Sequence, residues 1–264
     1  MKSTSPAVIL TACAVAIALA LPLAALAQSA DDYALVGAGV RSRPAYDGSA
    51  SQRADLIPAL RYYGRPWFAR TTQGILEGGA RAQLAPGLAL GAQIAYEPGR
   101  SASESDFLRD HGVADLDAGA SYGLHLEWDK KLGRMPINLL ARTRQHTDSD
   151  RGAQADFRLT AGIYGEGRLA AGVFTQLTWA NAKSARSFYG VTREQSGATR
   201  LPAFDPGSGV LFASFGLLGS FDLSRQWVLL GSLEGRRLRG DAARSPLAER
   251  TSNHYASASL AYRF

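Results

Sequence analysis

Cysteine is nearly absent from this sequence of 264 residues, which contains only Cys13. A single cysteine excludes an internal disulfide framework and any zinc site built from several cysteines. Charged residues are also few, at 20% of the chain, whereas 46% of the residues are hydrophobic. This composition excludes a disordered chain, and the length suits one or two domains with enough apolar residues for a core.

An uncharged apolar run occupies the N-terminus, from about Ala7 to Ala27, after the basic Lys2. The run ends in Ala25-Leu26-Ala27, a small-x-small cleavage site, so we expect a signal peptide over residues 1–27 and a mature domain over 28–264. Two alternatives are a retained membrane anchor and lipoprotein processing at Cys13, which only a short part of the apolar run precedes. The mature chain would contain no cysteine, so its export through the periplasm would need no oxidative folding.

No later segment has the roughly 20 consecutive apolar residues that a membrane-spanning helix requires. Apolar residues instead alternate with small or polar ones in several segments, among them 88–96, 157–163 and 171–179. A period of two residues indicates β-strands. In residues 116–128 the apolar face carries Leu116, Ala118, Ala120, Tyr122, Leu124, Leu126 and Trp128, and the other carries Asp117, Gly119, Ser121, Gly123, His125 and Glu127.

This alternation fits either a soluble β-sandwich or a membrane barrel whose apolar face meets lipid. Several runs reach about ten residues, the length of a tilted strand that crosses a bilayer, whereas soluble strands average about five or six. The chain also ends in a strand-like segment with Tyr262 third from the end and Phe264 last, which resembles the assembly signal of bacterial outer-membrane barrels. Together with the leader, these features predict an all-β transmembrane antiparallel up-and-down β-barrel in the Gram-negative outer membrane.

The alternating segments predict twelve strands, an even number that a closed antiparallel barrel with both termini in the periplasm requires. Connections after even strands are short, as periplasmic turns should be, and connections after odd strands are long, except at Thr72-Gln73. A ten-strand barrel that fuses or drops the 66–84 hairpin is the alternative. The twelve strands are expected near 33–41, 55–63, 66–72, 74–84, 88–97, 115–130, 136–146, 155–165, 170–182, 209–222, 226–238 and 253–264.

The face opposite the apolar one carries charges of both signs. A network of salt bridges that fills the lumen is one interpretation, and a selective pore is the other; a small barrel favours filling. The positions expected to point inward are Arg61, Glu77, Arg81, Glu97, Asp117, His125, Glu127, Arg142, Arg144, Arg158, Glu234 and Arg236.

The longest predicted loop spans residues 183–208 and holds Phe188, Tyr189, Arg193, Arg200 and Phe204. We expect it either to fold inward as a constriction or to present a binding surface, because long ordered loops are often functional. Basic residues are scattered between acidic ones, which argues against nucleic-acid binding. Arginine-rich outer loops would suit the phosphates of lipopolysaccharide, besides contact of the barrel with outer-membrane lipid.

Four histidines, His111, His125, His146 and His254, raise the question of a barrel hydrolase. The chain has no Gly-x-Ser-x-Gly, His-Glu-x-x-His or P-loop motif. His125, Glu127 and Ser121 share one face at strand spacing, so a hydrolase stays open as a third hypothesis, although any polar lumen offers such a set. We therefore predict no catalytic, cofactor or metal residues.

Three segments, taken with the leader and the C-terminal Tyr262-Arg-Phe264, make the chain similar to the MipA/OmpV family of outer-membrane proteins. The first runs from Gly37 to Ser49 and is followed by Leu56-Ile-Pro58 and Tyr62-Tyr63-Gly64. The second is Phe188–Ser196, and the third is Arg237–Leu247. These segments spread over nearly all of the mature chain, whereas 98–114 and 183–209 look less like the family.

The resemblance implies an outer-membrane β-barrel without a catalytic motif. The best-known member is a scaffold that links a lytic transglycosylase to a bifunctional penicillin-binding protein in murein synthesis. We therefore expect a non-enzymatic barrel that serves as a scaffold for murein hydrolase and synthase in peptidoglycan assembly, with a narrow pore for small solutes as the alternative. The short periplasmic turns imply that any docking surface is small.

Overall fold

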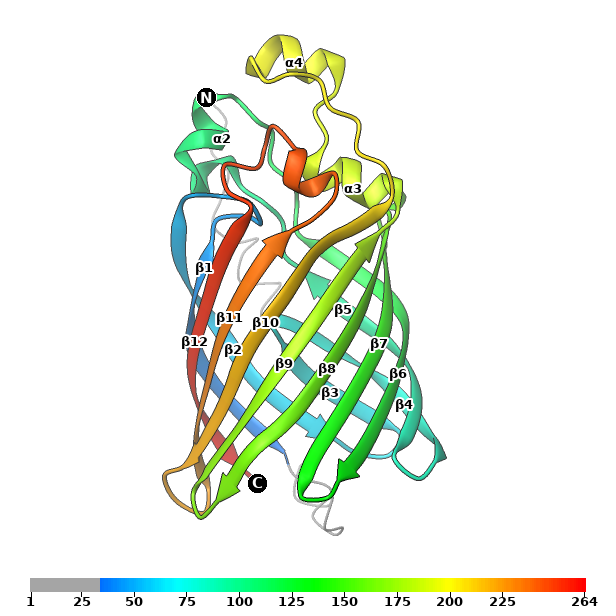
Figure 1. Cartoon of the computed structure of the whole chain (residues 1–264), viewed down its shortest axis with the longest axis vertical. Coiled ribbons are helices and arrows are strands. Elements are labelled where there is room, and N and C mark those ends of the chain that lie inside the picture. The colour runs from blue at the N-terminus through cyan, green and yellow to red at the C-terminus, as the bar shows by residue number, and fades with distance from the viewer. Residues whose placement is uncertain (1–33) are drawn as a thin grey trace, which may run out of the picture.

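The computed structural model describes residues 34–264, so the expected signal peptide over residues 1–27, with Cys13, lies outside the described residues. Within 34–264, twelve strands form a closed antiparallel barrel, and β1 closes the ring by pairing with β12 (Figure 1). The strands are β1 Leu35–Pro44, β2 Gln52–Tyr63, β3 Trp67–Thr72, β4 Ile75–Ala85, β5 Leu88–Glu97, β6 Gly119–Leu132, β7 Met135–His146, β8 Ala153–Glu166, β9 Leu169–Ala180, β10 Gly209–Asp222, β11 Trp227–Leu238 and β12 Ser252–Arg263.

The hairpin on which the strand count depended is present as β3 and β4. The two strands pair from Trp67↔Ala80 to Thr72↔Ile75. Gln73 and Gly74 form the turn with φ angles of 52° and 81°. Two-residue turns with positive φ match the twist of paired strands, so this tight link is a normal hairpin turn. The twelve-strand prediction is confirmed, and the ten-strand alternative is wrong.

The two ends of the barrel differ in their connections. Even strands lead into turns of two to four residues at the end where the C-terminus lies, and the helices gather at the opposite end (Figure 1). Short turns mark the periplasmic end and long loops the extracellular end of such barrels. No helix in residues 34–264 has the length and apolar character needed to cross a membrane. The helices are η2 Ala102–Glu104, α2 Asp106–Asp110, η3 Ser149–Arg151, α3 Ala182–Tyr189, α4 Arg193–Thr199 and η4 Ala242–Arg244.

The outer face of the barrel is an apolar belt bounded by aromatic residues. Large exposed side chains such as Ile94, Leu124 and Leu233 lie on it, each more than half exposed. So large an exposed apolar surface would be anomalous on a protein in water. Aromatic residues lie near both ends of the belt, as in membrane barrels: Trp67, Trp128, Trp227 and Tyr262 near the short turns, and Tyr96, Tyr122 and Trp179 near the long loops.

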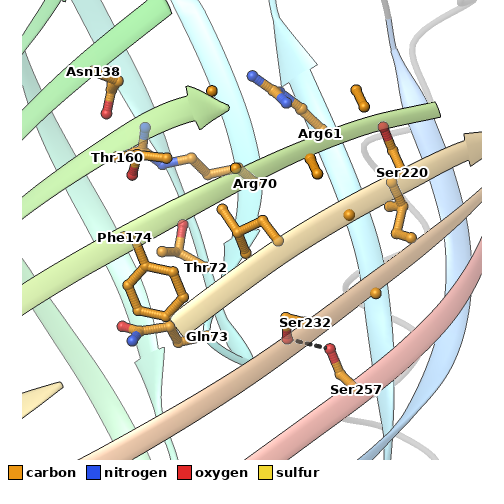
Figure 2. A pocket seen from close by; sticks show the side chains of 18 of the residues that line it. Arg61, Arg70, Thr72, Gln73, Asn138, Thr160, Phe174, Ser220, Ser232 and Ser257 are labelled. Carbon is orange, nitrogen blue, oxygen red and sulfur yellow. Dashed lines mark hydrogen bonds between the residues drawn. The ribbon is translucent and has the colours of Figure 1, made fainter. Parts of the chain in front are cut away.

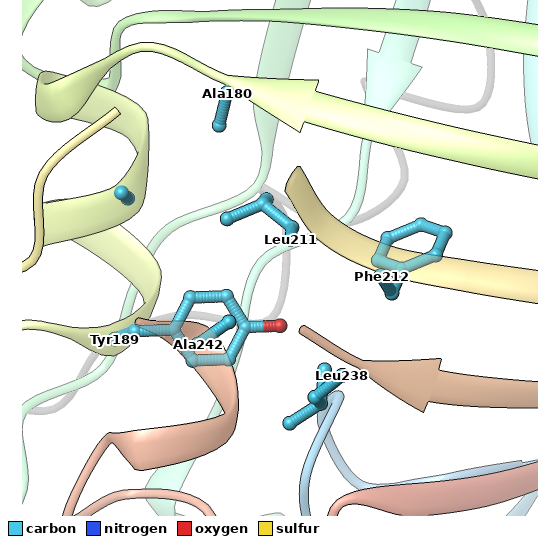
Figure 3. Close-up of a cluster of buried hydrophobic side chains, with 7 residues drawn as sticks. Ala180, Tyr189, Leu211, Phe212, Leu238 and Ala242 are labelled. Carbon is cyan, nitrogen blue, oxygen red and sulfur yellow. The ribbon is translucent and has the colours of Figure 1, made fainter. Parts of the chain in front are cut away.

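The extracellular end is closed by small apolar clusters beneath the loops. The 181–208 connection begins with α3, whose Tyr189 packs with Leu211, Phe212 and Leu238 at the ends of β10 and β11 (Figure 3). A second cluster joins Leu108 of α2 to Val191, Leu201 and Leu247, with Phe204 against it. The loop predicted over 183–208 therefore folds over the mouth of the barrel, while Arg193 and Arg200 stay exposed.

Candidate functional site

Charged side chains from β3 to β8 meet inside the barrel in one connected set, called here the ionic cluster. Arg142 is its centre: its Nη1 lies 2.7 Å from Glu77 Oε2, and its Nε lies 2.7 Å from Asp156 Oδ2. All three of these side chains are at most 1% exposed. The ionic cluster consists of Arg70, Glu77, Glu97, Glu127, Arg142, Arg144 and Asp156.

The pairs of the ionic cluster reach across strands rather than along them. Arg144 of β7 contacts Glu97 of β5 at 2.7 Å and Asp156 of β8 at 3.2 Å. Arg70 of β3 pairs with both Glu77 and Glu127. Buried charges are tolerated when they are paired and hydrogen-bonded, and the barrel meets this requirement by facing each arginine with two carboxylates.

A second polar group joins the β1–β2 loop and the β3–β4 turn to β11 and β12. Asp47, in the β1–β2 loop, accepts hydrogen bonds from Tyr255 and from Arg236, the latter at 2.8 Å. Arg236 also lies 3.0 Å from Glu234 Oε1, and Gln73 Nε2 donates to Glu234 Oε2 at 2.9 Å. The β3–β4 turn thereby contacts β11 across the lumen. Together with the ionic cluster, these contacts place paired polar side chains in the lumen above its lower half.

Tyr46, in the β1–β2 loop, is a buried hydrogen-bond donor at the extracellular end. Burial, assisted by the nearby carboxylate of Glu249, raises the pKa of Tyr46 well above its usual value. Its hydroxyl donates to the carbonyl oxygen of Leu247 at 2.9 Å. Tyr46 is thereby a hydrogen-bond donor between two extracellular loops, and its raised pKa keeps it protonated even in alkaline solution.

A cavity of about 1180 Å³, called here the vestibule, occupies the lumen below these contacts (Figure 2). It reaches Lys131, Arg134 and Glu166 at the short-turn end, so it opens toward the periplasm. Its walls combine hydroxyl groups such as those of Thr160 and Ser232 with the ring of Phe174 and the guanidinium groups of Arg61, Arg70 and Arg158.

The inward positions predicted from the sequence are confirmed, with one exception. Their strands carry Arg61, Glu77, Arg81, Glu97, His125, Glu127, Arg142, Arg144, Arg158, Glu234 and Arg236 on the lumenal face. Asp117 is the exception, because β6 begins only at Gly119. The chain before Gly119 is held by the Arg100↔Leu116 bridge, and the carbonyl oxygen of Asp117 accepts a bond from Arg151.

The histidine grouping expected of a hydrolase is not assembled. Ser121 Oγ donates to Glu97 Oε1 at 2.7 Å, and Glu127 pairs with Arg70. His125 packs edge-on against Phe68 with ring centroids 4.9 Å apart, and neither of its ring nitrogens has a hydrogen-bond partner within residues 34–264. In the same part of the chain, no group of three or more potential metal ligands is found.

Asp156, Arg70 and Asp47 are among the lumenal residues that sequence reasoning missed. Asp156 lies two residues before Arg158 on the same face, so the alternation of β8 contained the signal for it. Arg70 lies in β3, a strand of six residues whose alternation is too short to assign a face. Asp47 lies in a loop and reaches the lumen only through the fold, so no periodic signal could have found it.

The closed strand order, the apolar belt with its aromatic bands and the charged lumen define a transmembrane β-barrel of the bacterial outer membrane. The family described as "MltA-interacting protein MipA" matches residues 36–264. The chain belongs to this family, which confirms the resemblance seen in the sequence.

Solved structures are similar to the chain at low sequence identity, and one outer-membrane channel shares the barrel fold. An outer-membrane channel from Pseudomonas putida F1 has a TM-score of 0.52 and 12% identity, over 92% of this chain and 99% of that one. The translocator domain of the autotransporter NalP from Neisseria meningitidis has a TM-score of 0.49 and 10% identity, over 98% and 96%. LpxR from Salmonella typhimurium has a TM-score of 0.47 and 8% identity, over 86% of this chain and 99% of that one. No curated protein matches the sequence.

Proposed function

We propose that this protein is a non-enzymatic outer-membrane anchor whose periplasmic end docks a lytic transglycosylase and, through it, a murein synthase. The observation that carries the proposal is the closed lumen: Glu77, Asp156 and Thr178 are less than 2% exposed at the level of the ionic cluster. Buried ion pairs at this level oppose the passage of solutes, so we infer that the protein acts through its two ends. The family description names an MltA-interacting protein, which points to the periplasmic end.

The periplasmic turns offer a small basic surface, called here the periplasmic rim. Four of the five short connections, 64–66, 133–134, 167–168 and 223–226, each hold one exposed arginine: Arg65, Arg134, Arg168 and Arg225. These connections contain no carboxylate. Such a rim would attract an acidic face of a soluble partner and guide its docking. This supports the scaffold role and fits the small docking surface that short turns impose.

Charge reversal tests the docking. We expect replacement of Arg65, Arg134, Arg168 and Arg225 by glutamate to abolish capture of purified lytic transglycosylase by the barrel in detergent, because attraction would become repulsion. Capture by the natural chain should also weaken as salt rises, since salt screens exposed charges.

The matched control reverses four exposed arginines of the extracellular loops, Arg109, Arg193, Arg200 and Arg250. This variant should capture the enzyme as the natural chain does. Equal capture by both variants would contradict docking at the periplasmic rim, and no capture by the natural chain would refute the scaffold role.

Planar-bilayer recording separates the anchor from the alternative of a narrow pore. We expect the natural protein to insert without stable conductance steps, because the ionic cluster and the loop contacts of Asp47 close the lumen. Insertion would be verified by the heat-dependent gel shift of protein recovered from vesicles. Reproducible single-channel steps would contradict closure and favour the pore.

A further inference from the structure

The barrel wall has one weak seam, between β2 and β3. These strands share three register pairs, Arg61↔Arg70, Tyr62↔Ala69 and Tyr63↔Phe68, whereas β1 and β2 share ten. The edge of β2 from Gln52 to Leu60 therefore has no partner strand on this side within residues 34–264. Pro58 lies in that stretch, and proline is confined to strand edges or bulges because it cannot donate a ladder hydrogen bond.

The seam opens because the β3–β4 turn leans into the lumen. The carbonyl oxygen of Gln73 accepts a hydrogen bond from Arg41 Nη1 at 2.9 Å, and the Gln73 side chain donates to Glu234 on β11 at 2.9 Å. These contacts hold the turn away from the β2 edge. The opening between residues 58–60 of β2 and residues 71–74 is called here the β2–β3 slot.

Residues of the outward face line the slot. Pro58, Leu60 and Thr71 alternate with inward residues such as Arg61 and Arg70, so they belong to the outward face. All three nevertheless line the vestibule. Nearby on the same edge, Leu56 is 86% exposed, the largest exposure among the large hydrophobic side chains described. Here the wall between the vestibule and the membrane lacks strand pairing, and its outer side is apolar.

The inner end of the slot is cationic. Arg61 and Arg70 form the last register pair below the opening, and both line the vestibule (Figure 2). Arg70 uses its Nε and Nη1 within the ionic cluster, while its Nη2 has no hydrogen-bond partner within residues 34–264. The Nη2 group of Arg70 is therefore available as a hydrogen-bond donor beside the slot.

Arg158, in the same cavity, is a buried cation that forms no direct salt bridge within residues 34–264, although Glu234 and Asp156 are near enough to act on its charge. It is 9% exposed, and its guanidinium lies 3.8 Å from the centre of the Phe174 ring. Its Nε donates to Thr160 Oγ1 at 3.4 Å, and its Nη1 has no partner in the described part of the chain. A buried guanidinium that no carboxylate pairs with directly is costly, and its unpartnered Nη1 favours an anionic ligand.

We propose that the vestibule binds a single-chain anionic amphiphile, with a carboxylate or monophosphate headgroup at Arg158, Arg61 and Arg70 and an acyl chain that leaves through the β2–β3 slot into the membrane. The cationic vestibule accounts for the headgroup. The slot, walled by Pro58 and Leu60 and open to lipid, accounts for the chain. The site is independent of the periplasmic rim, so it adds to the proposed docking role rather than resting on it.

Native mass spectrometry of the full-length protein from a neutral maltoside detergent tests the headgroup, with palmitate and hexadecanol as probes. We expect palmitate to bind at least about tenfold more tightly than hexadecanol, the gain of one charged hydrogen bond. Arg158→Gln should remove this preference, while Arg225→Gln at a periplasmic turn should keep it. Arg158 lies outside the ionic cluster, so the variant should fold, which the heat-dependent gel shift verifies. The proposal would be overturned if the Arg158→Gln variant still bound palmitate more tightly than hexadecanol. It would also be overturned if the natural protein bound both probes equally.

A second pair of variants tests the slot. Leu60→Trp places a bulky ring in the opening, and Leu229→Trp makes the same change on the lipid-facing side of β11. We expect Leu60→Trp, and not Leu229→Trp, to weaken palmitate binding. The loss should be about tenfold or more, because the acyl chain would lose its apolar contacts in the slot. Lysophosphatidate in place of palmitate identifies which headgroup binds more tightly, and either result supports the site. Unchanged palmitate binding by Leu60→Trp, or competition by inorganic phosphate alone at equal concentration, would refute the lateral route.

Discussion

Replacement of Arg142 by alanine is expected to destabilise the barrel by about 3–5 kcal/mol, the cost of breaking a buried ion pair from one side. Arg142 is the common partner of Glu77 and Asp156, and all three side chains are essentially inaccessible. Removing it leaves Glu77 with Arg70 and Asp156 with Arg144, so that each buried carboxylate loses one of its two arginine partners. The free energy of unfolding in urea, followed by the gel shift of folded barrel in lipid vesicles, measures the loss.

A surface pair supplies the control for this experiment. Arg109 and Asp106 pair on α2 with side chains 57% and 80% exposed. Exposed pairs contribute about 0–1 kcal/mol, so Arg109→Ala should leave the urea midpoint nearly unchanged. If Arg142→Ala were as harmless as Arg109→Ala, the ionic cluster would not hold the strands together, and the closed lumen would need another explanation.

Gly37→Val is expected to prevent closure of the barrel. Gly37 lies on β1 opposite Ala261 of β12 and Ala59 of β2, at the seam that completes the ring. A Cβ atom at Gly37 would collide with the carbonyl oxygen of Leu260 and with the backbone of Ala261. Backbone atoms cannot rotate away as a side chain can, so we expect a cost above the roughly 3 kcal/mol usual for overpacking. The heat-dependent gel shift of refolded protein should be lost.

Gly231→Val is the matched change on another strand. A Cβ atom at Gly231 of β11 would lie 3.8 Å from the carbonyl oxygen of Ser257, an ordinary contact. This variant should refold and show the gel shift of the natural chain. A normal gel shift for Gly37→Val would mean that β1 and β12 approach each other less closely than the structure describes.

Much of the fold could be predicted because strand alternation is a local property. The positions of β5 at Leu88–Glu97 and β10 at Gly209–Asp222 follow directly from the period of two in their own residues. A predicted strand boundary was wrong where loop residues next to the strand also alternate between apolar and polar. Residues 115–118, for example, alternate but precede β6, because the chain there follows the extracellular loop rather than the barrel wall.

The candidate site was predictable only in part. The inward face of Arg142, Arg144 and Arg158 follows from alternation, yet nothing in their spacing distinguishes the two paired arginines from the one without a carboxylate. His125, Ser121 and Glu127 share a face, as the sequence indicated, but Ser121 and Glu127 bond to Glu97 and Arg70 instead of to the histidine. Partner choice inside a lumen depends on which strands face one another.

The strands, the lipid-facing side of each and membership of the family could be inferred without the structure, because each of these rests on residues close together in the chain or on a matching pattern. The choice between twelve and ten strands needed the pairing of β3 with β4. The tertiary structure alone decided that Arg142 meets Glu77, 65 residues away, and that the β3–β4 turn leans inward to Glu234. The physical reason is ring closure. Register and strand tilt set which side chains meet across the lumen and where the wall stays unpaired, and both are properties of the whole barrel.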